Sequence, residues 1–254
     1  MIELKNVSET LWLPLFGKAI ESKRKNGFIY DQKAIEIAEK ACELNPQLNK
    51  WWTKLSKELQ GLMIWRNITI DAHANDFIRS NPNATFVNIG AGLCTRYERI
   101  NNPNITWLEF DLPDVKNVWL EFNSETEKHK YYTQSIFEDE WIATIKNQSQ
   151  GPVLFIAEGL LMYFSKKQVA ELLEKLASNF PESEFVFEAY SKFILMKPQP
   201  DVKKTSAQRF ENPWGIKTGK DFEKWNSKLK HINDDYLMKN NKAPTHEMTM
   251  RWLE

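Results

Sequence analysis

The feature that most constrains the fold is a change of rhythm at Ala84. Beyond it, short runs rich in β-branched and aromatic residues alternate with stretches of helical pattern. This alternation is typical of an α/β fold with a mostly parallel sheet whose strands are joined by crossover helices. Five runs are candidate strands: Thr85–Ile89, Ile105–Phe110, Tyr131–Gln134, Val153–Ala157 and Glu184–Ala189.

The clearest helix signal lies between the last two candidate strands. Ser165 and Gln168 form a capping-box pattern, in which each side chain bonds the backbone of the other. An apolar stripe follows and ends at Pro181, and its members are Val169, Leu172, Leu173, Leu176, Ala177 and Phe180. Because such a stripe is what a helix buries against a sheet, we assign it to core packing.

The first eighty residues carry a helical pattern instead. Asp31 is a candidate N-cap for a helix that Pro46 ends, and a second helical stretch runs from about Leu48 to Ile78, with Gly61 as a possible break. We expect residues 1–80 to form a helical cap or lid region. Residues 81–254 are then the nucleotide-binding α/β core, with a loop insertion around 197–220.

The pattern weakens toward the end of the chain. A helix near Asp221–Leu229 and a strand around Ile232–Met238 are expected. The tail after Lys239 shows little apolar alternation, so we expect a final hairpin of the sheet to be minimal or absent.

Composition narrows the range of partners. Lys plus Arg and Asp plus Glu both number 34, so net charge attracts neither nucleic acid nor an anionic membrane. A small molecule or a peptide is the default partner, and the oligomeric state is left open. Cys42 and Cys94 are the only cysteines, too few for a disulfide framework and not spaced for zinc, so we expect a reducing, cytoplasmic setting without metal. No apolar run approaches the roughly 18 residues of a membrane span.

A glycine turn follows the first candidate strand. Gly90 and Gly92 let the backbone bend sharply at the carboxyl end of a strand, where open α/β sheets bind nucleotides. Two glycines alone also fit a tight turn without a ligand. Asp111 ends the second candidate strand, about 20 residues further on, where an acid accepts hydrogen bonds from ribose hydroxyls. Together they predict an adenosine-containing cofactor, either a nicotinamide dinucleotide or S-adenosylmethionine.

Two further residues refine this choice. Thr95 stands where the dinucleotide fingerprint requires a third small residue beside the pyrophosphate, so it favours S-adenosylmethionine. Glu158 leaves an almost wholly apolar strand, and a carboxylate there needs donors or a cation nearby. It is either a ligand-binding acid or a member of a salt bridge or helix cap.

Three motifs then resemble one known family. GAGLCTR at 90–96, EFDLP at 109–113 and AEGLLMY at 157–163 occur in the order and at the spacing found in the leucine carboxyl methyltransferase family, which includes bacterial polyketide O-methyltransferases. The resemblance extends from about Trp65 to Tyr190. It implies a class I methyltransferase fold of the Rossmann-like type, with a mostly parallel sheet flanked by helices, a helical N-terminal extension and S-adenosyl-L-methionine as cofactor.

The resemblance also implies roles around the methionine part of the cofactor. Arg66 corresponds to the arginine that holds the methionine carboxylate, a task that suits a guanidinium. Glu158 corresponds to the acid near the methionine amino group. Gly90 and Gly92 line the methionine and ribose, and Asp111 holds the ribose.

The match departs from the family at two points. Ser135 and Ile136 stand beside the adenine where the family has an Asp-Leu pair, so a hydroxyl replaces a carboxylate. Cys94 replaces the usual aspartate of the glycine motif. The adenine contact is therefore the one least defined by sequence.

The resemblance predicts methyl transfer to oxygen. A carboxylate acceptor is ionised at neutral pH and needs no base, whereas an alcohol or phenol needs one, and the sequence names none. This favours a carboxylate or an acidic hydroxyl, which Arg66 and Tyr163 would orient. Two alternatives remain: an NAD(P)-binding oxidoreductase with the same glycine turn, and a catalytically inactive cofactor-binding protein of the same fold.

Overall fold

The protein is described by a computed structural model that covers residues 10–191, 214–236 and 247–252. Within these ranges seven strands form one sheet in the order β3-β2-β1-β4-β5-β7-β6. The strands β1 (Thr85–Ile89), β2 (Thr106–Phe110), β3 (His129–Tyr132), β4 (Val153–Ala157) and β5 (Glu184–Phe187) are parallel. The predicted α/β fold with a mostly parallel sheet is confirmed.

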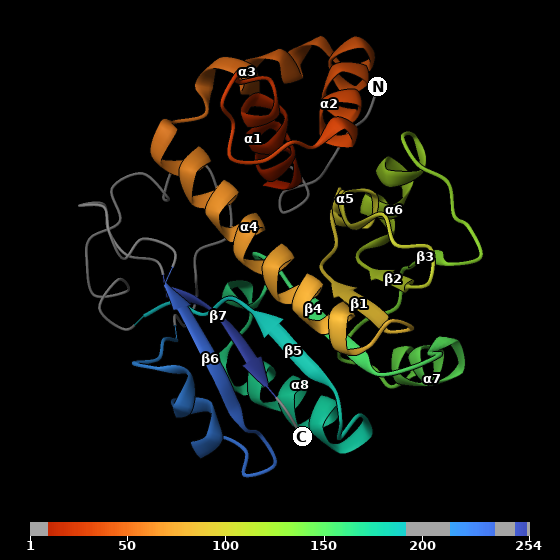
Figure 1. Cartoon of the computed structure of the whole chain (residues 1–254), viewed down its shortest axis with the longest axis vertical. Coiled ribbons are helices and arrows are strands. Elements are labelled where there is room, and N and C mark those ends of the chain that lie inside the picture. The colour runs from red at the N-terminus through yellow and green to blue at the C-terminus, as the bar shows by residue number, and fades with distance from the viewer. Residues whose placement is uncertain (1–9, 192–213, 237–246, 253–254) are drawn as a thin grey trace.

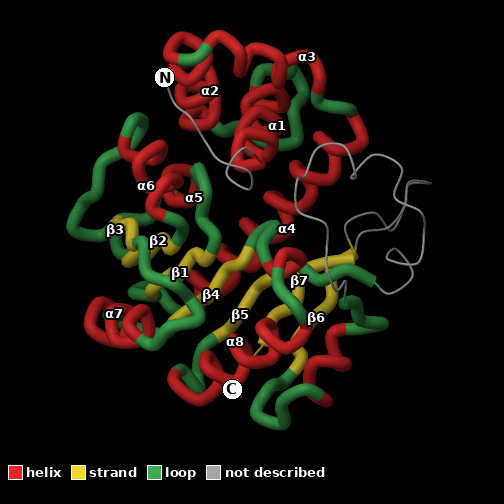
Figure 2. The backbone as a smooth tube through the Cα atoms, turned by 180° about the vertical axis from the view of Figure 1, so that it is seen from behind, coloured by secondary structure: helices red, strands yellow, loops and turns green. Residues whose placement is uncertain are grey.

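Helices cover both faces of this sheet because its strands alternate their apolar side chains between the two faces. Val87 and Phe155 face one side with α7 (Glu140–Gln148) and α8 (Lys166–Asn179). Phe86 and Leu154 face the other side with α4 (Lys57–Ser80) and α5 (Arg96–Ile100). Figure 1 shows α4 running diagonally across the front, and Figure 2 shows α7 and α8 on the opposite face.

The N-terminal helices lie above the end of the sheet that carries the glycine turn (Figure 1). They are α1 (Trp12–Ser22), α2 (Gln32–Leu44), the 3₁₀ helix η2 (Pro46–Lys50) and the short α3 (Trp51–Lys54). Phe16 and Ala38 share one apolar cluster with Leu93 of the glycine turn and Trp119 of α6 (Pro113–Leu120). The helical region is thus joined to the sheet through the candidate cofactor turn.

The local helix signals have the expected outcomes, with one exception. The Ser165–Gln168 capping box is present, and the Asp31 carboxylate accepts a hydrogen bond from the Ala34 backbone N–H at 2.8 Å. Gly61, however, does not break its helix, because α4 continues through it as one element of 24 residues. The interruption lies earlier, where the Ser56 side chain caps α4.

The end of the sheet corrects two expectations. The 3₁₀ helix η5 (Gly219–Lys224) replaces the longer helix predicted to Leu229. The strands β6 (His231–Tyr236) and β7 (Glu247–Trp252) are antiparallel, and β7 inserts between β5 and β6. The expectation of a minimal or absent final hairpin was therefore wrong. The strand β7 forms without regular apolar alternation because it pairs with a strand on each side.

One strand boundary and one insertion complete the comparison. The strand β3 begins two residues before the predicted Tyr131 because its pairing with β2 starts at His129. The insertion predicted around 197–220 lies outside the described residues as far as position 213. Among the residues that the structure describes, no helix combines the length and apolarity needed to cross a membrane.

Candidate functional site

The candidate site is at the carboxyl ends of β1, β2 and β4. The chain runs outward in both directions from β1, with β2 on one side and β4 on the other, so the β1–β4 boundary is a topological switch point. Open α/β sheets bind ligands in the crevice at such a point. Gly90 leaves β1 and Glu158 leaves β4 at this same place.

The turn after β1 requires glycine. Gly90 has a φ of +66°, and a Cβ there would lie 2.7 Å from the Leu160 side chain. The N–H groups of Gly90 and Ala91 both donate to the Phe110 carbonyl oxygen, at 2.8 and 3.2 Å. The turn is thereby held against the end of β2, and the next N–H group, that of Gly92, donates to Asp111.

Asp111 is a carboxylate without a cation. Its Oδ2 accepts a hydrogen bond from the Gly92 N–H at 2.7 Å, and its Oδ1 accepts one from the Leu112 N–H at 2.7 Å. Burial raises the pKa of Asp111 above its ordinary value, against the lowering effect of these two bonds. No cation pairs with it among the described residues. Since two carboxylate oxygens offer about four acceptor positions, capacity remains for two ribose hydroxyls.

Glu158 lies between two buried arginines. Its Oε1 accepts from Arg66 Nε at 2.9 Å and from Asn67 Nδ2 at 3.1 Å, and its Oε2 accepts from Arg96 Nη2 at 2.6 Å. Burial alone would raise the pKa of Glu158, but the two guanidinium groups outweigh burial and hold the pKa well below its ordinary value. The salt-bridge alternative is thus present in the structure, and the role toward the cofactor stays a prediction.

The same ionic network reaches the N-terminal helices. Arg96 Nε donates to Asp71 Oδ1 at 2.5 Å, and Arg99 Nε donates to Asp71 Oδ2 at 2.9 Å. Arg99 Nη1 donates to Asp31 Oδ2 at 2.7 Å, and the Thr95 hydroxyl donates to the same oxygen at 2.5 Å. Thr95 therefore fastens the N-cap of α2 to the glycine turn.

A third glycine, Gly159, leaves room for the Arg66 guanidinium. Gly159 has a φ of +65°, and a Cβ there would lie 3.2 Å from Arg66 Nη1. Arg66 Nη1 lies 3.4 Å from Glu188 Oε2, so the guanidinium contacts acids that follow two different strands. Its Nη2 makes no hydrogen bond with any described residue and is free to bind a ligand carboxylate.

Lys18 is the main residue that the sequence did not reveal. It lies on α1 and is only 3% exposed, yet no described residue forms a hydrogen bond or ion pair with its ammonium group. Its charge contributes to lowering the pKa of Glu158, so the ammonium lies near that end of the crevice. The signal was its position on the buried stripe of α1, three residues after Leu15 and four before Ser22.

The loop after β3, where the adenine contact is predicted, is less enclosed. Ser135 is exposed and its Oγ accepts from the Phe137 N–H at 3.3 Å, while Ile136 packs against the main apolar cluster. The preceding Gln134 has a buried Oε1 without a hydrogen-bond partner. Because a buried acceptor without a donor is costly, a ligand amino group at this place would be favourable.

The crevice fits S-adenosylmethionine. Asp111 has acceptor capacity for the ribose, Lys18 and Arg66 Nη2 supply cationic donors for a carboxylate, and Gln134 supplies an unsatisfied acceptor. No group of three or more acidic, histidine or cysteine side chains within the described residues is arranged to hold a metal ion.

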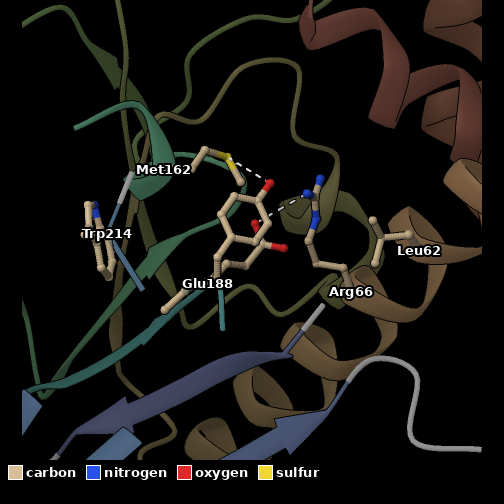
Figure 3. A pocket seen from close by; sticks show the side chains of 7 residues that line it. Leu62, Arg66, Met162, Glu188 and Trp214 are labelled. Carbon is tan, nitrogen blue, oxygen red and sulfur yellow. Dashed lines mark hydrogen bonds and ion pairs between the residues drawn. The ribbon is translucent and has the colours of Figure 1, made fainter. Parts of the chain in front are cut away.

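Arg66, whose guanidinium pairs with Glu158, also lines a small cavity (Figure 3). It is lined by Leu62, Arg66, Met162, Glu188, Ala189, Tyr190 and Trp214. Tyr163, predicted to orient the acceptor, is on the 3₁₀ helix η3 (Leu161–Tyr163) and does not line the cavity, whereas its neighbour Met162 does. Tyr163 contributes to raising the pKa of Tyr190, after burial and Glu188.

Sequence comparisons identify relatives. Residues 13–177 match the family model described as leucine carboxyl methyltransferase. The chain is 24% identical over 195 residues to the tetracenomycin polyketide synthesis O-methyltransferase TcmP of Streptomyces glaucescens, covering 76% of this chain and 70% of that protein. It is 22% identical over 191 residues to an S-adenosyl-L-methionine-dependent methyltransferase of Gibberella zeae, covering 72% of this chain and 64% of that protein.

Solved structures share the fold. Human N-acetylserotonin methyltransferase in complex with S-adenosylmethionine has a TM-score of 0.50 at 13% identity, covering 98% of this chain and 67% of that chain. Magnesium protoporphyrin IX methyltransferase of Synechocystis with bound S-adenosylhomocysteine has a TM-score of 0.53 at 9% identity, covering 86% and 100%. At these identities the likeness concerns the fold alone.

Proposed function

The chain belongs to the leucine carboxyl methyltransferase family and is an S-adenosylmethionine-dependent methyltransferase, and from this premise we propose that it methylates an oxygen atom of a small molecule. One observation carries the proposal: Arg66, to which the resemblance assigns the methionine carboxylate, also lines a small apolar and aromatic cavity. A methyl group held beside Arg66 would thus face this small cavity. The likeness to a polyketide O-methyltransferase supports an organic acceptor with an oxygen nucleophile.

The cofactor contacts follow from the site. Asp111 binds the ribose hydroxyls, and the turn at Gly90 and Gly92 lines the ribose and methionine. Arg66 Nη2 and the Lys18 ammonium bind the methionine carboxylate, since both are buried donors without another partner. Glu158 fixes the Arg66 guanidinium and accepts from the methionine amino group.

The adenine contact uses the loop after β3. Ile136 covers one face of the base, and the Ser135 backbone lies along its edge. Gln134 Oε1 accepts from the adenine amino group, which compensates for the missing aspartate at position 135. The sequence departure at Ser135 then moves the contact by one residue and does not remove it.

The chain orients the acceptor against the methyl group and excludes water from the site. The bound cofactor supplies an already activated methyl group, so an oxygen nucleophile must only be held in line with it. The network of Arg66, Glu158 and Arg96 is rigid because each buried charge has a partner. Tyr163 follows Met162, which lines the cavity, and we assign Tyr163 the orientation of the acceptor that the resemblance implies.

Two experiments test the proposal. Calorimetric titration compares S-adenosylmethionine with NADH, and we expect binding of the former alone; tight binding of NADH would favour the oxidoreductase alternative. Purified protein is then incubated with S-adenosylmethionine and a panel of aromatic hydroxyl, carboxyl and amino compounds, and methylated products are identified by mass spectrometry. Cofactor binding without any methylated oxygen compound would indicate the inactive alternative.

A further inference from the structure

A tyrosine on the third strand contacts the glycine turn, and neither the motifs nor the resemblance gives it a role. Tyr131 lies on β3, and its side chain is fully buried. Its hydroxyl donates a hydrogen bond to the Gly92 carbonyl oxygen at 3.2 Å. The edge strand β3 thus reaches the turn after β1, across the intervening strand β2.

Gly92 is held on both sides of its Cα. Its N–H donates to Asp111 Oδ2 at 2.7 Å, and its carbonyl oxygen accepts from Tyr131. These two groups belong to successive peptide planes, and only the φ and ψ angles of Gly92 separate the two planes. A glycine has no Cβ to restrict these angles. The two hydrogen bonds therefore hold the conformation that the residue by itself leaves open.

The conformation at Gly92 is one that only hydrogen bonds and the absence of a side chain explain. Gly92 has a φ of +58°, which favours glycine. A Cβ there would meet only ordinary van der Waals contact, with the Leu11 side chain at 3.7 Å. Space is thus available for a side chain, and the backbone angle is what requires glycine here.

The tyrosine ring is itself held firmly. Its centroid lies 5.1 Å from that of Trp119 of α6, at an interplanar angle of 42°. The Tyr131 N–H donates to Glu125 Oε1 at 2.8 Å, and Lys116 Nζ donates to the Tyr131 carbonyl oxygen. Because packing and backbone contacts fix the ring, the position of the hydroxyl is defined before any ligand binds.

The single hydroxyl hydrogen leaves Asp111 available. Burial raises the pKa of Tyr131 well above its ordinary value, and the charges of Asp111 and Glu109 raise it further, so the phenol stays protonated. A phenol has one hydrogen to donate, and Tyr131 donates it to Gly92. The hydroxyl therefore supports the turn without occupying an acceptor position of the nearby Asp111 carboxylate.

We propose that Tyr131 is a positioning residue of the cofactor site. It holds the Gly92 carbonyl, keeps the Gly92 N–H on Asp111 Oδ2, and thereby directs the remaining acceptor positions of Asp111 toward the two ribose hydroxyls. The inference rests on the proposed function, because the ribose contact of Asp111 is part of it. Tyr131 acts through the turn and through Asp111.

The first test measures recognition of the ribose hydroxyls. S-adenosylhomocysteine and its dideoxy analogue, which lacks both ribose hydroxyls, are titrated by calorimetry. The unaltered protein should bind S-adenosylhomocysteine at least about tenfold more tightly than the analogue. In Tyr131→Phe this preference should fall about fivefold, the usual effect of one hydrogen bond, while binding of the analogue stays within about twofold. An unchanged preference, or equal losses for both compounds, would overturn the proposal.

The neighbouring tyrosine provides the matched control. Tyr132 is the next residue on β3, so its side chain lies on the opposite face of the sheet, where its ring stacks on Phe110 with the centroids 5.2 Å apart. No described residue forms a hydrogen bond with its hydroxyl. Tyr132→Phe should bind both compounds as the unaltered protein does. A reduced preference in this variant as well would show that loss of any tyrosine hydroxyl from β3 has the effect, which contradicts a specific role of Tyr131.

A double variant tests whether Tyr131 acts through Asp111. In the Asp111→Asn background, Tyr131→Phe should not reduce the preference further, because residues in one hydrogen-bonded chain are not additive. Independent losses in the double variant contradict the proposal. Gly92→Ala disturbs the same backbone while keeping the tyrosine, and should also reduce the preference, since alanine is strained at a positive φ. A full preference in Gly92→Ala contradicts the role given to this turn.

The unaltered protein separates failure of this inference from failure of the proposed function. If it binds both compounds equally, the ribose contact of Asp111 is wrong, and the inference falls with it. If it prefers S-adenosylhomocysteine and Tyr131→Phe keeps that preference, the ribose contact stands and only the role of Tyr131 is refuted.

Discussion

At the scale of single residues, Asp111 tests the cofactor assignment most directly. Asp111→Asn replaces one acceptor oxygen by a donor and removes the negative charge, so we expect it to weaken S-adenosylmethionine binding about 10- to 100-fold, as for hydrogen bonds to charged groups. Isothermal calorimetry measures the change. Asp114→Asn on the exposed first turn of α6 is the control. Unchanged affinity in Asp111→Asn would refute the ribose contact.

Lys18 gives a second prediction at this scale. Lys18→Met keeps most of the apolar volume and removes the ammonium, so we expect weaker binding of S-adenosylmethionine by about tenfold. Adenosine has no methionine carboxylate and should bind both proteins equally. Equal losses for the two ligands would mean that Lys18 supports the fold of α1 and does not contact the carboxylate.

At the scale of elements, the structure couples the N-cap of α2 to the glycine turn through Asp31. Asp31→Asn retains an oxygen for the cap but removes the charge that pairs with Arg99, and breaking a buried pair costs about 3–5 kcal/mol. We expect lower stability in urea unfolding together with weaker cofactor binding, because the turn loses its contact at Thr95.

A second cap provides the comparison for Asp31. Ser165→Ala removes the capping box of α8, which lies on the other face of the sheet, and should cost about 1 kcal/mol of stability. Its cofactor affinity should not change. If Asp31→Asn also left cofactor affinity unchanged, α2 and the glycine turn would be independent elements.

At the scale of the whole molecule, two acids give opposite pH dependences of stability. The pKa of Glu158 is lowered in the folded protein, so its contribution to the free energy of unfolding is fully present above the ordinary pKa of about 4.3 and is lost progressively as pH falls from there through the lowered value. The pKa of Glu188 is raised by burial, so folding binds its proton more tightly and its contribution falls as pH rises through the raised value.

Unfolding in urea at several pH values measures both effects. Relative to the unaltered protein, Glu158→Gln should be destabilised by about 3–5 kcal/mol at pH 7, with the difference shrinking toward pH 3. Glu188→Gln should be as stable or more stable at pH 7, and this gain should disappear in acid. If both variants changed stability in the same direction at pH 7, this difference between the two acids would be contradicted.

The local signals of the sequence were sufficient for most of the fold. Strands β1 and β4 begin and end where predicted, and the capping box defines the start of α8. These elements depend on neighbouring residues: apolar runs, caps and turn residues act over a few positions. The strand β7 was missed because its formation depends on pairing with distant strands.

The candidate site likewise combines features that the sequence determines with features that only folding decides. Sequence by itself determined the glycine turn, Asp111 and Glu158, because each stands at a strand end in a recognisable motif. Only the tertiary structure decided that Glu158 pairs with two arginines, that Lys18 from α1 approaches them, and that Glu188 shares a cavity with Arg66. Burial and charge partners belong to side chains far apart in the chain, and only folding brings these together.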